Sequence, residues 1–148
     1  MQKMTKPTQE ARFEYKGFPC VVLFQWLGHR CGYVGIPKNH KFHNVDYMEL
    51  SIDCHGGLTY SDSYLYGQED EDIWWIGFDC GHYTDKQDYE SVKKYYSDNE
   101  EVMKITAWAQ ENLAQPSFGQ VRNLDYVINE CKSIIDQFDN PELLGGGE

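Results

Sequence analysis

The sequence IWWIGFDCGHYTD, residues 73–85, decides the fold of this chain. Its first seven residues combine two tryptophans with two isoleucines and a phenylalanine, and such aromatic and β-branched residues favour a strand. We therefore predict that 73–79 forms the central strand of a sheet, with one of the two tryptophans in the core. Polar residues follow at the point where a strand gives way to a loop, and these are Asp79, Cys80, His82, Thr84 and Asp85.

A similar polar cluster occurs earlier, in the sequence IDCHGGLTYSD at residues 52–62. Its members are Asp53, Cys54, His55, Gly56, Gly57 and Thr59. The residues before it predict a short strand over 51–54. Because both clusters follow predicted strands, we expect the two loops to converge on one site that pools their imidazoles and carboxylates.

The remaining segments predict strands in the first half of the chain and helices in the second half. Strands are expected over 11–16, 18–26 and 31–36, and helices over 88–96, from the capping-box pattern Ser97-x-x-Glu100 to Leu113, and over 120–138. The acidic, tyrosine-rich segment 60–72 is expected to be an exposed loop or an edge hairpin. This order favours an α+β fold, a mostly antiparallel β-sheet with C-terminal helices packed on one face. We expect 1–148 to form a single domain, with flexible tails at 1–9 and 141–148.

The composition disfavours several classes of function. The 148 residues include 24 Asp and Glu against 13 Lys and Arg, which gives a formal net charge of -11. That charge disfavours binding to a nucleic-acid backbone, which needs a basic surface. No apolar run has the length of a membrane span, and the polar N-terminus lacks the apolar segment of a signal peptide. We therefore expect no membrane partner and a cytoplasmic location.

The two polar clusters together have the composition of a ligand-binding site. The glycine pair and Thr59 can present backbone N–H groups and a hydroxyl to an anion, and protonated His55 and His82 would offset its charge. Nearby tyrosine and tryptophan rings can stack on a base or sugar. The predicted ligand is a small anionic molecule, nucleotide-like in character. The predicted ligand-binding residues are His55, Gly56, Gly57, Thr59, Asp79, His82 and Asp85.

The same residues can also be interpreted as a metal site. His55, Asp79, His82 and Asp85 are of the types that zinc, iron or manganese accept as ligands. A divalent metal held by them would keep open positions for water or substrate, as in a metal-dependent hydrolase. A third interpretation is structural, because Asp and Thr side chains after strands commonly form hydrogen bonds that pin turns.

The sequence assigns no catalytic residue. Five cysteines without a C-x-x-C pair, in a chain without a signal peptide, predict free thiols. Cys54 and His55 are adjacent in a predicted strand, so their side chains point to opposite faces and do not form a nucleophile–base pair. We take the other histidines as loop residues by default, namely His29, His40 and His43. Of these, His40 is the best placed to join the site, because its loop leads into the strand that carries His55. Glu130, at the margin of the last apolar stripe, is expected to be solvated, and the alternative is that it reaches the edge of the sheet.

Four motifs resemble a family of small, uncharacterised proteins of bacteriophages and prophages. They are GYVGIPKNH at 32–40, HGGLTY at 55–60, WWIGFDCGHYTD at 74–85 and LDYVINEC at 124–131. The resemblance covers most of the chain between Gly32 and Cys131, although the segment 88–119 looks longer than is typical of the family. It implies a phage or prophage origin and action in the cytoplasm of a bacterial host, but it transfers no catalytic residue.

Three functions follow as hypotheses. The leading one is a phage-encoded protein that binds an anionic ligand, with counter-defence by sequestering a host immune signal as one use. The second is a metal-dependent hydrolase that uses the His and Asp cluster. The third is an acidic protein-binding inhibitor of a host factor, acting through Glu69–Asp72 and Asp98–Glu101.

Overall fold

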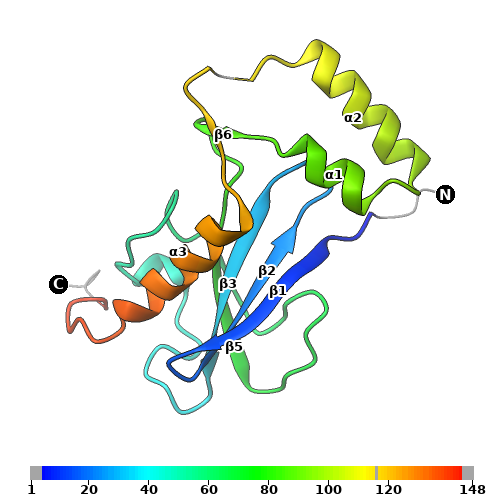
Figure 1. Cartoon of the computed structure of the whole chain (residues 1–148). Coiled ribbons are helices and arrows are strands. Elements are labelled where there is room, and N and C mark those ends of the chain that lie inside the picture. The colour runs from blue at the N-terminus through cyan, green and yellow to red at the C-terminus, as the bar shows by residue number, and fades with distance from the viewer. Residues whose placement is uncertain (1–4, 116, 145–148) are drawn as a thin grey trace.

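A computed structural model describes residues 5–115 and 117–144 of the chain. Five strands form one antiparallel sheet in the order β1-β2-β3-β5-β4 (Figure 1). They are β1 (Thr8–Tyr15), β2 (Phe18–Phe24), β3 (Arg30–Pro37), β4 (Tyr60–Asp62) and β5 (Ile73–Asp79), and β6 (Asp85–Lys86) pairs in parallel with β7 (Gln120–Val121). The helices are α1 (Tyr89–Tyr95), α2 (Glu100–Asn112) and α3 (Leu124–Asp136), with a 3-10 turn at Tyr47–Glu49. The predicted α+β class is confirmed.

β5 lies inside the sheet, between β3 and the short edge strand β4. Its side chains alternate between the two faces, as the period of a strand requires. Trp75 is buried in the apolar cluster on one face, and Ile76 and Phe78 are buried in the cluster on the other. Trp74 is half-buried, and its indole Nε1 donates a hydrogen bond of 2.9 Å to the Val45 carbonyl. One of the two tryptophans is therefore core, as predicted.

α3 covers one face of the sheet (Figure 1). The buried residues of its apolar stripe are Val127, Cys131, Ile134 and Ile135. They pack against alternate side chains of the central strands, such as Val22 and Val34. The helix begins where Asn123 accepts a hydrogen bond from the Tyr126 backbone N–H, an N-cap that satisfies one of the unpaired donors of the first turn.

α1 and α2 lie beyond one end of the sheet (Figure 1). There they pack around the Phe24 ring. Val92 of α1 and Val102 of α2 are buried against that ring. Beside it Arg30 is buried, with nitrogen–oxygen distances of 2.6 Å to Glu10 and 3.0 Å to Asp88. None of the helices in residues 5–115 and 117–144 has both the length and the apolar character needed to cross a membrane.

The segment 51–54 forms no strand, contrary to the sequence-based prediction. Its backbone hydrogen bonds are made instead with the C-terminal part of the chain: the Ser51 N–H donates to the Leu143 carbonyl at 2.7 Å, and Gln137 Nε2 donates to the Asp53 carbonyl at 2.7 Å. These partners lie far away in sequence, so the local strand propensity of the segment does not decide its conformation.

Other boundaries also differ from the predictions. The helix expected over 120–138 begins only at Leu124, because Gln120–Val121 forms β7. Leu143 is buried and β1 begins at Thr8, so both expected tails are shorter than 1–9 and 141–148; residues 1–4 and 145–148 lie outside the described residues. α2 is capped by Asn99 rather than by Ser97, because the Asn99 side chain accepts the Val102 N–H. The segment 60–72 begins with the edge strand β4 and continues as a loop.

Candidate ligand-binding site

The two polar loops meet beside the N-terminal end of α3. His55 Nε2 lies 2.9 Å from Asp85 Oδ2, and the ring centroids of His55 and His82 are 5.8 Å apart. Next to them, Thr59 Oγ1 donates a hydrogen bond of 3.2 Å to Asp79 Oδ2. The expectation that the loops converge and pool their imidazoles and carboxylates is therefore confirmed.

Asp85 is the centre of a buried hydrogen-bonding network. Its side chain is 2% exposed, and its Oδ1 accepts a hydrogen bond of 2.9 Å from Arg122 Nε. Its Oδ2 accepts from His55 and, at 3.0 Å, from the backbone N–H of His82. Burial alone would raise the pKa of Asp85, but the hydrogen bonds from His55 and Arg122 hold it below its ordinary value. The carboxylate is therefore charged and paired at neutral pH.

His55 connects this carboxylate to α3. Its Nδ1 lies 2.8 Å from the Tyr126 hydroxyl, and its backbone N–H donates to Glu130 Oε1 at 2.8 Å. In a neutral imidazole the nitrogen facing the Asp85 carboxylate carries the hydrogen, so Nδ1 accepts the hydrogen bond from Tyr126. Glu130, expected to be solvated, thus holds the polar loop instead.

The network has a structural role that limits its chemistry. Both ring nitrogens of His55 already face hydrogen-bond partners, so neither offers a lone pair to a metal without breaking a bond. Within the described residues, no three or more His, Cys, Asp or Glu side chains are grouped so that they could hold a metal ion. The geometry therefore does not support the predicted metal set of His55, Asp79, His82 and Asp85, nor the hydrolase that depends on it.

Gly56 lets the two loops approach closely. Its φ is +69°, and a Cβ atom built on it would lie 2.3 Å from His82 Nε2. The neighbouring Gly57 has a φ of +80° and open space at the Cβ position, and its N–H donates to the Cys54 carbonyl at 2.9 Å. The glycine pair therefore serves a tight turn and a contact with His82, and the Gly57 N–H is not free for an anion.

A pocket of about 550 Å³ opens beside the network, at the end of β5. Its volume is within the range of roughly 300–1,000 Å³ that is usual for small-molecule sites. It is lined by Leu27, His29, Cys31, Tyr33, Thr59, Tyr60, Phe78, Asp79, Gly81 and Gln87. Tyr33 and Tyr60 meet edge to face, with ring centroids 5.3 Å apart, so the aromatic wall is already ordered by packing.

The charges around this pocket are acidic or neutral. Asp79 is the carboxylate among the described lining residues, and none of them is Lys or Arg. Burial lowers the pKa of His29, although Asp79 and Asp85 nearby act in the opposite direction. Because imidazole ordinarily titrates near 6.5, the His29 ring is neutral at pH 7.

Asp79 is held in place at the pocket wall. Its Oδ2 accepts the Thr59 hydroxyl hydrogen bond, and its Oδ1 accepts the backbone N–H of Gly81 at 3.0 Å. His82 Nε2 lies 3.3 Å from the same Oδ1. This nitrogen is buried and makes no hydrogen bond within the described residues. A carboxylate has about four lone-pair positions, so Asp79 can still accept hydrogen bonds from a ligand.

A second hollow of about 320 Å³ adjoins the segment 79–87. His82, Asp85 and the segment 113–115 contribute to its lining. It shares Gly81 and Gln87 with the first pocket, so this loop forms a wall of both.

The cysteines near the site are protonated thiols. Burial raises the pKa of Cys31 to about 11 and that of Cys54 to about 12, and it also raises the pKa of Cys80. A thiol is a nucleophile mainly as its thiolate, so these groups are poor nucleophiles at neutral pH.

The seven predicted ligand-binding residues lie together but divide into two groups. His55, Gly56, Gly57 and Asp85 build the buried network and its turn, whereas Thr59 and Asp79 line the larger pocket; His82 lies between the groups. His40, the best placed of the loop histidines in the sequence analysis, does not join the site. Its ring packs against Phe18, Phe42 and Phe138 beside the C-terminal end of α3.

Sequence reasoning missed Arg122, Tyr126 and His29. Arg122 and Tyr126 are four residues apart, and the Arg122 guanidinium lies 4.9 Å from the Tyr126 ring centroid. That spacing across the first turn of a predicted helix was the available signal, because residues four apart are neighbours on a helix surface. His29 gave no such signal, since it lies in a turn between two strands.

No family model matches this chain, and neither a curated protein nor a solved structure matches it. The resemblance to phage and prophage proteins therefore remains a prediction that rests on the four sequence motifs. The functional inference rests on the geometry of the pocket and of the network beside it.

Proposed function

We propose that the protein binds a small molecule with a flat, hydrogen-bonding ring, of the nucleobase or nucleoside class, in the pocket beside Asp79. The observation that carries this proposal is a fixed carboxylate in a pocket of ligand size with aromatic walls. Aromatic side chains offer a stacking or edge contact to any base, and a few fixed polar groups then select among bases.

The chemistry of Asp79 defines which rings fit best. An ionised carboxylate only accepts hydrogen bonds, and it can accept two from neighbouring donors. Thr59 and Gly81 fix its orientation and leave lone pairs for a ligand. The edge of guanine presents two adjacent N–H donors, so guanine-type rings should bind more tightly than adenine or uracil rings.

The lining charges favour a neutral ring over an anionic group. A phosphate placed in this pocket would lie near Asp79, in a chain of net charge -11, with a neutral His29 beside it. The Arg122 guanidinium is engaged by Asp85. The sequence predicted an anionic, nucleotide-like ligand. We therefore propose that the pocket holds the ring of such a ligand and that any phosphate points away from Asp79.

Such binding would serve a phage by sequestration. In a phage-encoded cytoplasmic protein, a pocket that holds a ring without transforming it would lower the free concentration of a host molecule that carries the ring. A host immune signal is one candidate of this kind. Sequestration needs affinity and abundance but no catalytic group, which is consistent with a site in which the network around His55 is fully hydrogen-bonded.

The proposal is tested by thermal shift with a panel of guanine, guanosine and guanosine mono-, di- and triphosphates, and with the adenosine and uridine series. Guanosine should raise the melting temperature, because a ligand that binds only the folded state stabilises it by mass action, by roughly 2.7 kcal/mol at 100 times Kd. Each added phosphate should reduce the shift. Asp79→Asn should remove the guanosine shift, since an amide replaces an acceptor oxygen with a donor.

Asp53→Asn is the matched control, because Asp53 is an exposed carboxylate in the other polar cluster and does not line the pocket. It should leave the guanosine shift unchanged. A panel without any shift in the unsubstituted protein would refute the proposal. A melting-temperature shift that grows with the number of phosphates would refute it in favour of the anionic ligand predicted from the sequence.

A further inference from the structure

One face of α2 exposes large apolar side chains. Trp108 is 57% exposed and Ile105 is 39% exposed, although α2 packs its opposite side on α1 (Figure 1). The two residues are three apart, so they are neighbours on one side of the helix. A tryptophan side chain has a large apolar surface that is usually buried. Tryptophan is also one of the residues most enriched among the anchors of protein interfaces.

The exposed face continues into a groove. Trp108 and Ile105 form one wall, and Trp26, Leu27, Tyr89 and Leu113 contribute to the rest, around a volume of about 100 Å³. Leu27 and Leu113 are themselves about half exposed. A groove with exposed apolar walls of this kind is typical of a surface that receives a side chain from another molecule. We call it the α2 groove.

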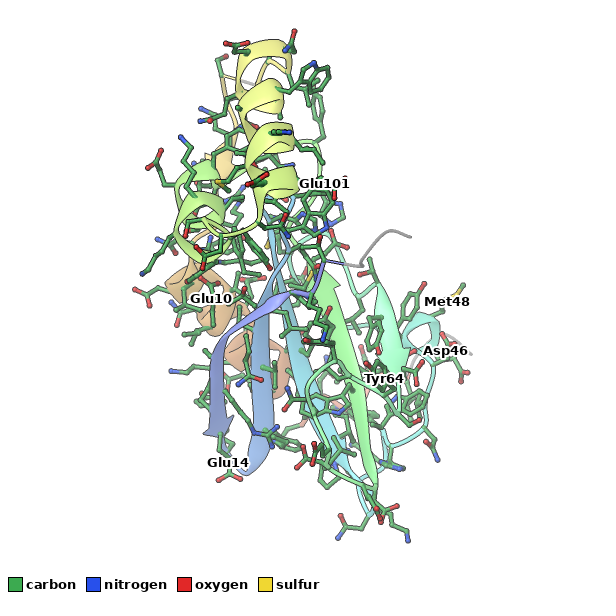
Figure 2. The ribbon with its side chains drawn as sticks, turned by 90° about the vertical axis from the view of Figure 1, so that its right-hand side faces the viewer. Glu10, Glu14, Asp46, Met48, Tyr64 and Glu101 are labelled. Atoms are coloured by element: carbon green, nitrogen blue, oxygen red, sulfur yellow. The ribbon has the colours of Figure 1, made fainter. Side chains whose placement is uncertain are left out.

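Acidic side chains flank Trp108 on the exposed side of α2, although none of the described residues that line the α2 groove is charged. Glu101 lies two turns before Trp108 and Glu111 one turn after it, both exposed on the same side of the helix. Figure 2 shows Glu101 near the start of α2, above Met48 and Tyr64 in that view. Over residues 98–113 the charged side chains are Asp98, Glu100, Glu101, Lys104 and Glu111. Four acids against one base give this surface a negative potential.

We propose that the α2 groove binds a basic amphipathic segment of another protein, which inserts an apolar side chain beside Trp108 and places Lys or Arg against Glu101 and Glu111. Charge complementarity determines which kind of partner binds in the α2 groove. A second copy of this chain would bring an equally acidic helix to the groove, and an anionic membrane surface would be repelled in the same way. A basic amphipathic segment can place an apolar side chain in the α2 groove and basic side chains beside Glu101 and Glu111.

The α2 groove also touches the rim of the ligand pocket, because Leu27 and Gln87 line both. The inference does not rest on the proposed ligand, since Asp79 is not part of the groove. The variant Asp79→Asn therefore separates the two ideas: it should abolish the guanosine shift and leave binding at the α2 groove unchanged.

The test uses fluorescence anisotropy with two labelled synthetic helices, one built from Leu and Lys and one in which Glu replaces every Lys. The Leu/Lys peptide should bind the full chain and the Leu/Glu peptide should not. Trp108→Ala should weaken binding by about tenfold or more, as the loss of an interface anchor does. The pair Glu101→Gln and Glu111→Gln should weaken binding and reduce its dependence on salt.

Tyr64→Ala is the matched control, because it removes another exposed aromatic side chain far from α2 (Figure 2). Equal Leu/Lys affinity for the unsubstituted, Trp108→Ala and Tyr64→Ala proteins would overturn the proposal, since it would mean non-specific charge attraction. Reversible dimerisation in sedimentation, lost in Trp108→Ala, would assign the groove to a second copy instead. Binding to anionic lipid vesicles through Trp108 would overturn it in favour of a membrane.

Discussion

The imidazole Nε2 of His55 lies 2.9 Å from the carboxylate Oδ2 of Asp85, although 30 residues separate the two in the sequence. Through this contact the loop after residue 52 is tied to the loop after β5, and Arg122 and Tyr126 tie both to the start of α3. A network in which every member has a partner is rigid, because each group would lose a hydrogen bond on moving. We infer that it holds the 79–87 loop as a wall of the ligand pocket.

Replacing Asp85 by Asn should destabilise the fold strongly. The change removes the charge that Arg122 and His55 face and leaves the guanidinium without its counter-ion in a site where the carboxylate is 2% exposed. Breaking a buried pair by removing one partner costs about 3 kcal/mol or more. Urea denaturation measures this as a lower midpoint with an unchanged slope.

Asp136→Asn provides the comparison, because Asp136 pairs with Lys16 on the surface, with a side chain that is 47% exposed. Solvent screens that pair, so its loss should change the urea midpoint far less. Equal effects of the two substitutions would contradict the role assigned to the Asp85 network.

Gly56→Ala should destabilise the protein more than Gly57→Ala does. Both glycines have positive φ, so each alanine carries a backbone penalty of about 1–2 kcal/mol. A Cβ on Gly56 would in addition collide with the His82 ring at 2.3 Å, whereas a Cβ on Gly57 meets open space. The difference between the two variants in chemical denaturation isolates the contact with His82. If the two lose the same stability, the close approach of the loops is not required.

Stability should fall as the pH decreases below neutrality. Burial lowers the pKa of His29 and of His40 from the ordinary 6.5, so between their folded and unfolded pKa values the unfolded chain binds more protons. Their contribution is present above about pH 6.5 and is lost as the pH falls through the folded values. The lowered pKa of Asp85 adds a second loss, which begins below its ordinary 3.8 and proceeds as the pH falls further.

Denaturation midpoints measured from about pH 7 to about pH 5 check the histidine part of this prediction. His29→Gln should flatten the slope in that window, because one of the two shifted groups is then absent. Lys38→Gln, an exposed substitution in a surface loop, should leave the slope unchanged. A constant midpoint across the window in the unsubstituted protein would contradict the buried, neutral state of these rings.

The thiols should be unreactive until the protein unfolds. Burial raises the pKa of Cys54 to about 12 and that of Cys31 to about 11, so the thiolate fraction is small at mildly alkaline pH. An aromatic disulfide reagent should label the native protein slowly, and Cys54, the least buried of the five, should react first. Rapid labelling of all five in urea provides the reference. Fast native labelling of Cys80 would contradict its burial.

The sequence predicted the main strands well, because residues 73–79 combine strong strand propensity with burial on both faces. α3 was equally clear from its stripe of Val127, Cys131 and Ile134. Both signals are local: they depend on residues within one element, so tertiary contacts reinforce rather than override them. The convergence of the His55 and His82 loops was also predicted, but one of its two premises was wrong, because 51–54 forms no strand.

The features that could not be predicted from the sequence depend on contacts between residues far apart in the chain. The segment 51–54 has strand-forming residues, but Leu143 and Gln137 satisfy its backbone in another conformation. The partners of Asp85 include Arg122, which follows it by 37 residues and carries no motif. The polar residues divide into a buried network and an open pocket, and this division also depends on where α3 begins. Patterns in a single sequence do not show how far the start of α3 lies from the two polar loops.

The most direct test of the account is an NMR titration that follows backbone amide shifts of the labelled protein as guanosine is added. The pocket beside Asp79 predicts saturable shifts at Thr59, Gly81 and Gln87, and their loss in Asp79→Asn. Shifts confined to the α2 groove around Trp108, or no saturable shifts at all, would contradict it.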